Sequence, residues 1–266
     1  MMKSLKTLAV LIALFIAVPL FIVVPMSFSA NASLQFPPSA YWWGNYQHFF
    51  SDINWMQPLF NSLYIGLATT LLTLALAIPA SFALVRHYFI GRTALNLLLM
   101  LPMIVPQIVM ALGYYLYFGR LHLTQSFTGI IIVHTCLGIP VATLILTAAL
   151  RSFDANLEHA AHSLGAPALT TFWLVTLPVL RPAVLVAGLF AFIQSFDETV
   201  IAVFISGRDT ATLPRQMFNS FRMEADPVIS AASSFLFILV LAALLLPLAV
   251  RLTRRSSGSA AGHLAR

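Results

Sequence analysis

Six apolar runs, each long enough to cross a bilayer, dominate the pattern of hydrophobic and polar positions along the chain. A membrane-spanning helix needs about 20 predominantly apolar residues. Prolines and glycines interrupt several runs, which is tolerated where neighbouring helices satisfy the freed backbone groups. We therefore predict an all-α membrane protein, with six transmembrane helices packed around a pathway in a single transmembrane domain, residues 1–266. The predicted spans are about 8–27, 60–85, 95–118, 128–150, 179–206 and 228–250.

The composition agrees with lipid as the main solvent. The 266 residues are 60% hydrophobic and 8% charged, whereas a soluble domain carries roughly 25% charged residues. The formal net charge is +6, but the basic residues sit in short loops between the apolar runs rather than in one stripe. We therefore expect membrane lipid, and no nucleic acid, as a partner.

The distribution of positive charge predicts the orientation. If the N-terminus is inside, only Arg120, Arg208, Arg215 and Arg222 of the 14 lysines and arginines fall on the outer side. Cytoplasmic loops carry the excess of positive charge in membrane proteins, so both termini are predicted to be cytoplasmic. The first outer loop, about 28–58, contains tryptophans and tyrosines typical of an interfacial belt.

Both ends of the chain allow further interpretation. The run at 8–27 could instead be a cleaved signal peptide, since lysines precede it and Ala30-Asn31-Ala32 resembles a cleavage site. Against cleavage, the run is longer than a typical signal core and contains two prolines. The Ser-, Gly- and Ala-rich tail 255–266 is predicted to be disordered.

No catalytic constellation is visible in the sequence. Lysine occurs only at positions 3 and 6, so a phosphate-binding loop with a lysine after glycines is excluded, and we expect neither enzymatic activity nor a cofactor. His159 and His162 could share a helix face, but two solvent- or partner-facing histidines explain them better than a metal site. His134 lies within a span and is predicted to form an interhelical hydrogen bond.

The cytoplasmic segment 151–178, between the fourth and fifth spans, is the most informative. Asp154 is suited to an N-cap and Glu158 to the first turn of a helix, while Gly165 followed by a proline predicts its end. The predicted helix of about ten residues is amphipathic, with small residues that allow another chain to approach closely. The alternative is an ordinary helix lying on the membrane surface. A second short helix, 167–176, is expected to end at Leu177-Pro178.

This segment resembles the EAA loop of permease subunits of bacterial ATP-binding-cassette (ABC) importers of the type I fold. In that pattern E-A-A, three residues and a glycine are followed, nine residues later, by I-x-L-P. The motif glutamate falls on His159, while Glu158 precedes it by one residue, and adjacent helix residues point about 100° apart. The matching positions are Ala160, Ala161, Gly165, Val175, Leu177 and Pro178.

The resemblance implies a transporter complex of several subunits. The loop would form the coupling helix that docks into an ATPase subunit, with Glu158 and His159 in or beside the docking surface. The importer would contain a second permease subunit, two ATP-binding-cassette ATPase subunits and a periplasmic substrate-binding protein, in the bacterial inner membrane. ATP would be bound by the partner subunits. The stretches 195–200, 204–207 and 212–214 resemble the spermidine/putrescine branch, although relatives for ferric iron, opines and phosphonates share parts of them.

Asp197 and Glu198 are the only acidic residues within an apolar run. A carboxylate at membrane depth costs about 2.5–3.5 kcal/mol on insertion scales and is a functional candidate by default. Together with Phe196, these acids could bind a cationic substrate in the pathway. The alternative is that the span ends near Ser195 and that the acids cap a helix or pair with arginine.

Two other function classes are alternatives to an ATP-driven importer. An ion-coupled secondary transporter would need its own coupling-ion site and would work without an ATPase. An intramembrane enzyme would need a nucleophile or metal set near membrane depth. The outer loop 207–227, with acidic and basic residues mixed, fits docking of a periplasmic binding protein or a solvated loop.

Overall fold

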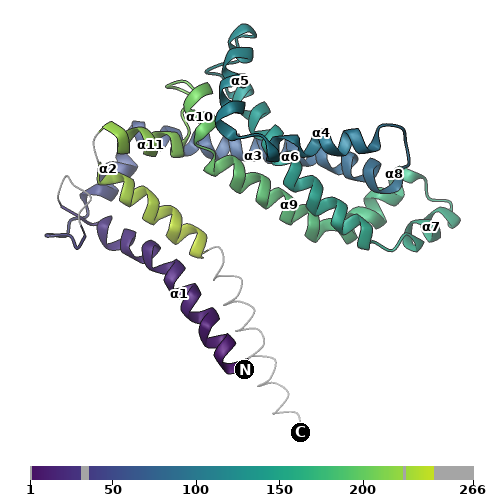
Figure 1. The fold of residues 1–266 in the computed structure, drawn as a ribbon, viewed down its shortest axis with the longest axis horizontal. Coiled ribbons are helices and arrows are strands. Elements are labelled where there is room, and N and C mark those ends of the chain that lie inside the picture. The colour runs from purple at the N-terminus through teal and green to yellow at the C-terminus, as the bar shows by residue number, and fades with distance from the viewer. Residues whose placement is uncertain (1, 31–35, 224–225, 243–266) are drawn as a thin grey trace. The chain divides into compact units, whose positions relative to one another are not determined.

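The chain folds into helices joined by short loops (Figure 1). The computed structural model describes residues 2–30, 36–223 and 226–242, so the predicted tail 255–266 lies outside the described residues. One isolated antiparallel bridge joins Ser29 to Tyr41. The helices are α1 (Met2–Met26), α2 (Gly44–Ser51), α3 (Ile53–Arg86), α4 (Arg92–Ile104), α5 (Gln107–Arg120), α6 (Phe127–Ser152), α7 (Asn156–Ser163), α8 (Ala168–Thr171), the π-helical turn Phe172–Thr176, α9 (Leu177–Asp197), α10 (Val200–Ile205), α11 (Leu213–Met223) and Val228–Ala242.

Four described helical segments are long and apolar enough to cross a membrane, and a bent pair could add a fifth span. The bent pair is α4 and α5, at the position of the predicted span 95–118. The described part of the predicted span 228–250 is a shorter apolar helix, Val228–Ala242. The count of six spans therefore remains a prediction. The four segments are Thr7–Met26, Ile53–Arg86, Phe127–Ser152 and Ala168–Asp197.

The chain divides into two compact units. Unit 1 comprises the chain up to Met56 and from Asn219 onward; unit 2 is Gln57–Phe218. Within unit 1, helix Val228–Ala242 contacts α1: the Ser234 hydroxyl donates to the Val23 carbonyl over 3.2 Å. An aromatic cluster of Phe28, Trp43 and Tyr46 packs the expected outer loop of this unit.

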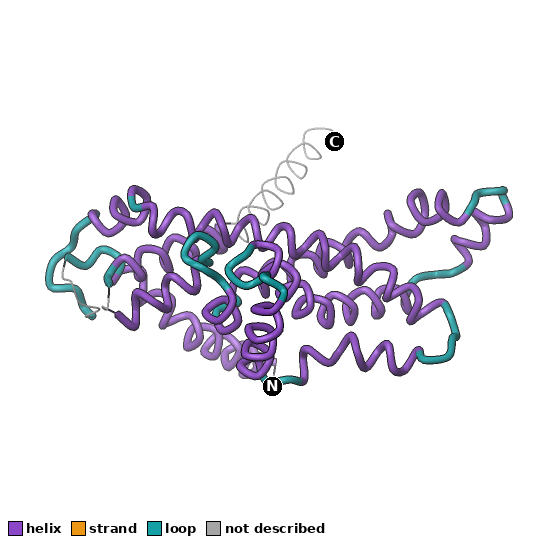
Figure 2. The backbone as a smooth tube through the Cα atoms, turned by 90° about the horizontal axis from the view of Figure 1, so that it is seen from above, coloured by secondary structure: helices purple, strands orange, loops and turns teal. Residues whose placement is uncertain are grey.

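Unit 2 is built around α3, α6 and α9, which run side by side along its length (Figures 1 and 2). Small residues let these helices approach closely, as is common between membrane helices. A Cβ added to Gly138 of α6 would lie 3.0 Å from the Thr73 hydroxyl of α3. Ala77, Ala142 and Ala187 form a buried cluster with Leu146 at the same three-helix contact.

The predicted span 95–118 is not one straight helix. Helices α4 and α5 are bent by 103° at Val105–Pro106. Pro106 has no N–H to donate, and its ring forces the preceding residue out of the helical region; Val105 accordingly has φ −77° and ψ 133°. Figure 1 shows α5 projecting away from the direction of α4, and α5 instead packs against α10 through Ala111, Phe118, Ile201 and Ile205.

The helix at the predicted fifth span, 179–206, begins and ends earlier than predicted. Helical structure runs without a break from Ala168 to Asp197, and α10 follows as a separate helix. The expectation that a second short helix ends at Leu177-Pro178 is therefore wrong. A π turn precedes Pro178, with the Leu177 N–H donating to the Phe172 carbonyl. Proline is tolerated in the first turn of a helix, and the wide turn accommodates its missing donor.

Close packing at Gly138 generates the first prediction. Gly138→Leu should lower the stability of the protein by about 1–3 kcal/mol, because the larger side chain overpacks the contact with α3. Thermal unfolding in detergent, followed by size-exclusion chromatography, measures this change. Gly113→Leu is the matched control, since no atom lies within 4 Å of an added Cβ there. Equal loss of stability in both variants would contradict the role of close packing.

Candidate functional site

The segment 151–178, predicted to be cytoplasmic, forms the expected exposed helix. Helix α7 spans eight residues, Asn156–Ser163. Asp154 lies just before the N-cap residue Ala155, and its Oδ1 accepts from the Asn156 N–H over 3.0 Å. Gly165 has φ 85°, a left-handed conformation that glycine adopts without strain and that ends helices. The predicted helix and its glycine stop are therefore present, with a helix two residues shorter than the ten expected.

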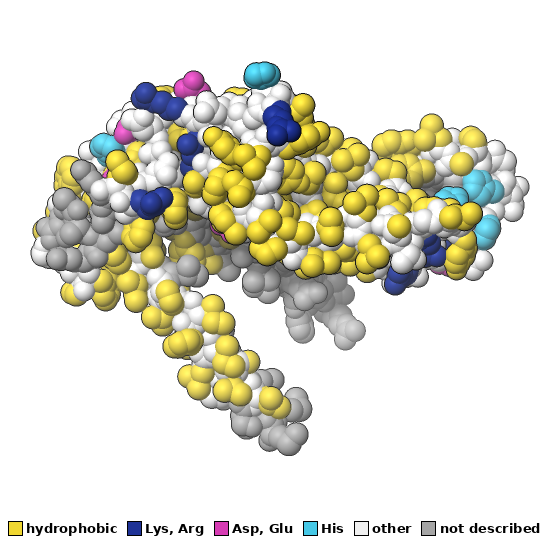
Figure 3. Space-filling view, turned by 45° about the horizontal axis from the view of Figure 1, so that its top comes forward, with side chains coloured by type: hydrophobic (Ala, Val, Ile, Leu, Met, Phe, Trp, Pro, Cys, Tyr) yellow, Lys and Arg dark blue, Asp and Glu magenta, His cyan; other side chains and the backbone are white. Residues whose placement is uncertain are grey.

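None of the residues of α7 is buried within the chain. His159, Ala160 and His162 are exposed, and Leu164, just after the helix, is 89% exposed. Figure 3 shows histidine side chains gathered at the end of unit 2 where α7 lies. Leu157 and Leu164 of the predicted apolar face are therefore open to another molecule, whereas Ala161 is half-buried.

Glu158 differs from its exposed neighbours because its carboxylate contacts other parts of the chain. Its Oε2 lies 3.2 Å from Nη2 of Arg86, the last residue of α3. Its Oε1 accepts from the Thr176 hydroxyl over 2.7 Å. His159, at the position of the motif glutamate, is exposed. The two neighbouring residues therefore point to different surroundings, as their spacing on a helix requires.

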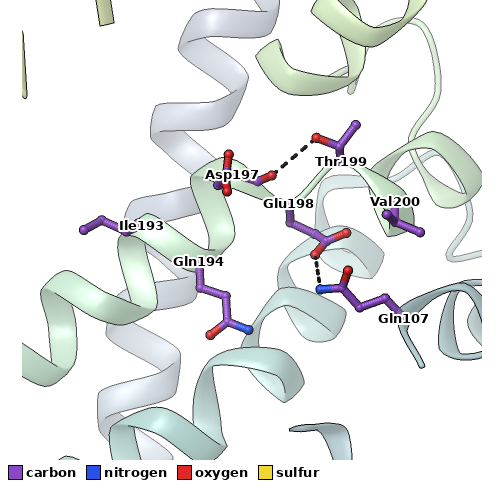
Figure 4. Close-up of a pocket in the computed structure, with 7 residues that line it drawn as sticks. All are labelled: Gln107, Ile193, Gln194, Asp197, Glu198, Thr199 and Val200. Atoms are coloured by element: carbon purple, nitrogen blue, oxygen red, sulfur yellow. Dashed lines mark hydrogen bonds between the residues drawn. The ribbon is translucent and has the colours of Figure 1, made fainter. Parts of the chain in front are cut away.

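The other predicted site lies at the opposite end of α9. A cavity of about 360 Å³ opens where α9 ends and α10 begins (Figure 4). Neutral amides from α5 and α9 join the two acids around it, so polar groups converge there in an otherwise apolar unit. The lining residues are Gln107, Ile193, Gln194, Asp197, Glu198, Thr199 and Val200.

Glu198 accepts hydrogen bonds from unpaired donors at the break between α9 and α10. It is 5% exposed, and its Oε1 accepts from the Ile201 N–H over 2.8 Å. Figure 4 shows its carboxylate directed at Gln107, whose amide donates to Oε2 over 3.1 Å. A carboxylate near a helix N-terminus satisfies unpaired N–H groups and complements the helix dipole. Glu198 thus has the helix-capping position considered as the alternative to a pathway role.

Asp197 has a different environment. It is the last residue of α9, is exposed, and lines the cavity. Among the described residues, no hydrogen bond or ion pair engages its carboxylate. A negative side chain at a helix C-terminus is unfavourable because the helix dipole is negative there. Asp197 therefore does not serve the stability of α9, and its charge is available to a ligand in the cavity.

Phe196 and His134 lie in the helical packing beside this cavity. Phe196 stacks on Phe192, with ring centroids 5.8 Å apart, and is not among the cavity-lining residues. His134 of α6 is 1% exposed, and its Nδ1 lies 2.8 Å from the Ser195 hydroxyl of α9. The predicted interhelical hydrogen bond of His134 is therefore confirmed.

The first part of the segment 207–227, which was predicted to be an outer loop, is held within unit 2 by hydrogen bonds. The Asn61 amide of α3 donates to the Asp209 and Ala211 carbonyls, each over 2.9 Å. The Arg215 guanidinium donates to the Ser206 hydroxyl and the Gly207 carbonyl. Arg208 is exposed. Only part of this segment therefore remains accessible to a partner.

Sequence reasoning missed several residues of both sites. Gln107 and Gln194 line the cavity, and Arg86 and Thr176 hold Glu158. A signal for Gln107 was present, since a polar residue directly after Pro106 marks a break in an apolar run. Arg86 was assigned only to the charge distribution. The contact partners of Glu158 are distant along the chain, so no local pattern indicates them.

These features together define a membrane transport subunit. Apolar helices form its core, the exposed helix α7 lies beside the start of the long helical segment Ala168–Asp197, and a polar cavity lies at the end of that segment. Residues 76–256 match the family described as the binding-protein-dependent transport system inner membrane component. This match covers more than half of the chain, so the chain belongs to that family. It is a multi-pass permease subunit of an ABC importer in the inner membrane, not an enzyme, and such subunits work with ATPase and substrate-binding partners.

Three relatives indicate the breadth of the family. The spermidine/putrescine transport system permease protein PotC of Haemophilus influenzae is 29% identical over 216 residues, 81% of this chain and 83% of its own length. The putrescine transport system permease protein PotI of Escherichia coli is 30% identical over 185 residues, covering 65% and 66%. The sulfoquinovosyl glycerol transport system permease protein SmoH of Agrobacterium fabrum is 32% identical over 191 residues, covering 71% and 67%.

A solved structure shows the same fold. The chain resembles one chain in the crystal structure of a bacterial ABC transporter involved in the import of the acidic polysaccharide alginate, with a TM-score of 0.71. The alignment covers 94% of both chains at 17% sequence identity. The predicted type I ABC importer permease fold is therefore confirmed at the level of the fold.

The capping role of Glu198 generates a second prediction. Glu198→Ala should destabilise the protein by about 1–2 kcal/mol, because the Ile201 N–H and the Gln107 amide lose their acceptor. Asp197→Ala, at the adjacent exposed position, should leave stability nearly unchanged. Thermal unfolding of both purified variants measures the difference. If Asp197→Ala destabilised the protein as much as Glu198→Ala, the assignment of capping to Glu198 alone would be wrong.

Proposed function

We propose that this permease moves polyamines, such as spermidine and putrescine, into the cell as part of an ATP-driven importer. Asp197 carries the proposal: a carboxylate without a partner among the described residues, at the negative end of a long helix, beside a cavity. Both the side chain and the helix terminus attract a cation there. The PotC and PotI relatives, named for polyamine transport, support this substrate class.

The cavity also offers hydrogen-bond acceptors that suit ammonium groups. Gln107, Gln194 and Thr199, whose side chains each carry an acceptor oxygen, line it together with Asp197. An ammonium group has three donors and no acceptor, so it needs several such oxygens in place of water. In this proposal Asp197 supplies the charge, and Glu198 keeps the break between helices in the geometry that exposes Asp197.

The assembly would contain a second permease subunit, two ATPase subunits and a periplasmic binding protein, with both termini of this chain in the cytoplasm. Helix α7 would dock on an ATPase subunit through His159, Ala160, Ala161 and the apolar residues beside them. Gly165 would end the docking helix, and Leu177 with Pro178 would carry its motion into α9. ATP-driven closure would then turn the pathway outward, as in alternating access.

A second candidate is the same machinery with a different solute. The match to a sulfoquinovosyl glycerol permease supports a cargo other than a polyamine. In that case the binding protein, rather than the permease, would select the solute. A carboxylate in the pathway would then contribute little to uptake. The effect of substituting Asp197 on uptake therefore distinguishes the two candidate substrates.

Asp197→Asn should abolish polyamine uptake while the complex still assembles. The substitution removes the charge but keeps the size of the side chain, so a loss of about tenfold or more in uptake is expected. Uptake of labelled spermidine into proteoliposomes containing the complete importer measures it. Asp209→Asn is the matched control, because Asp209 is exposed on the outer loop and does not line the cavity. Unchanged uptake in Asp197→Asn would remove this residue from the pathway.

Docking through α7 leads to a separate prediction. Ala160→Trp should strongly reduce co-purification of the ATPase subunit with the permease, since a bulky ring on the exposed small-residue surface prevents close approach. Ala40→Trp, at an exposed position of the expected outer loop, should leave co-purification unchanged. Pull-down from detergent-solubilised membranes compares the two variants. Retention of the ATPase by Ala160→Trp would exclude docking at this surface.

A further inference from the structure

The carboxylate of Glu158 joins three elements at the cytoplasmic end of unit 2. Its Oε2 contacts Arg86 at the end of α3, its Oε1 accepts from Thr176 in the π turn, and its own backbone belongs to α7. The side chains of Arg86 and Glu158 are 24% and 21% exposed. A pair shielded to this degree is weakened less by solvent than a fully exposed surface pair.

Arg86 is held in place by a second contact. Its guanidinium carbon lies 5.4 Å from the centroid of the Phe153 ring, a cation–π arrangement. Phe153 is buried in a cluster with Leu150 of α6 and Leu180 of α9. The side chains of Phe82, one turn before Arg86, and of Val85, directly before it, pack against the same cluster. The arginine is therefore fixed on the ends of all three core helices.

We propose that Glu158 is a positioning residue that fixes the coupling helix to α3, rather than a contact for the ATPase subunit. This assignment rests on the proposed docking of α7. The chain links α7 directly only to α6 and, through α8 and the π turn, to α9. The contact between Glu158 and Arg86 adds the third core helix, so that displacement of α7 moves α3, α6 and α9 together. The exposed His159 and His162 remain available to the partner.

A double-mutant cycle in the assembled importer tests the contact. Glu158→Gln and Arg86→Gln should each increase amide hydrogen exchange in residues 154–178 by about fivefold, because each removes the same ion pair. The double variant should exchange no faster than either single variant. Arg92→Gln is the matched control: its guanidinium also lies over an aromatic ring, that of Tyr88, without a carboxylate partner among the described contacts. It should leave exchange in 154–178 unchanged.

Two functional readouts separate positioning from docking. Glu158→Gln and Arg86→Gln should both raise the number of ATP molecules hydrolysed per substrate imported, with undiminished co-purification of the ATPase subunit. Loss of the ATPase from Glu158→Gln alone, or additive exchange effects in the double variant, would overturn the proposal. The exchange measurement requires no transported substrate. Failure of polyamine uptake would therefore count against the proposed substrate and not against this contact.

Discussion

A helix that begins inside an apolar unit leaves its first backbone N–H groups without partners, and in unit 2 the buried carboxylate of Glu198 supplies one of the missing acceptors at the start of α10. Unsatisfied backbone groups cost several kcal/mol in lipid, so non-helical backbone persists there only where the protein itself satisfies it. The hydrogen bonds from Ile201 and Gln107 to Glu198 stabilise the start of α10 directly after α9 ends at Asp197. The cavity, the exposure of Asp197 and the packing of α5 on α10 all depend on that end.

One continuous helical segment connects the two sites. From Ala168 to Asp197 the chain is helical over 30 residues, about 45 Å at 1.5 Å per residue. The segment beside α7 lies at its start and the cavity at its end. Close contacts at Gly66, Gly138 and Gly188 hold this helix against α3 and α6. Packed helices, rather than loops alone, therefore connect the region beside α7 with the cavity.

The sequence predicted what depends on local pattern. Apolar periodicity located α3 and α6 to within a few residues, apart from the early start of α3, and Asp154 and Gly165 marked the limits of α7. It did not separate Asp197 from Glu198, because adjacent acids in one apolar run look alike until the helix end between them is known. Pro106 and the polar Gln107 mark an interruption of the apolar run, but they do not give the angle of the bend, which depends on how α5 packs against α10.

Contacts between distant residues were beyond any local pattern. The pairing of Arg86 with Glu158 joins residues of different helices, as does that of Gln107 with Glu198. Whether Pro178 ends a helix or lies at the start of one also depends on the backbone geometry of the preceding turn. A proline after a short helix usually indicates its end, but the π turn Phe172–Thr176 allows the helix to continue.

That π turn has a consequence for how the permease tolerates changes of length. A π turn contains about one residue more than an α turn, and one residue corresponds to about 100° of rotation around a helix axis. The turn therefore sets the rotation about the helix axis between α7 and the acids at the far end of α9. Deleting a single residue between 168 and 175 would rotate one against the other while keeping Thr176 and the other side chains described at both sites. In this segment, spacing matters as much as residue identity.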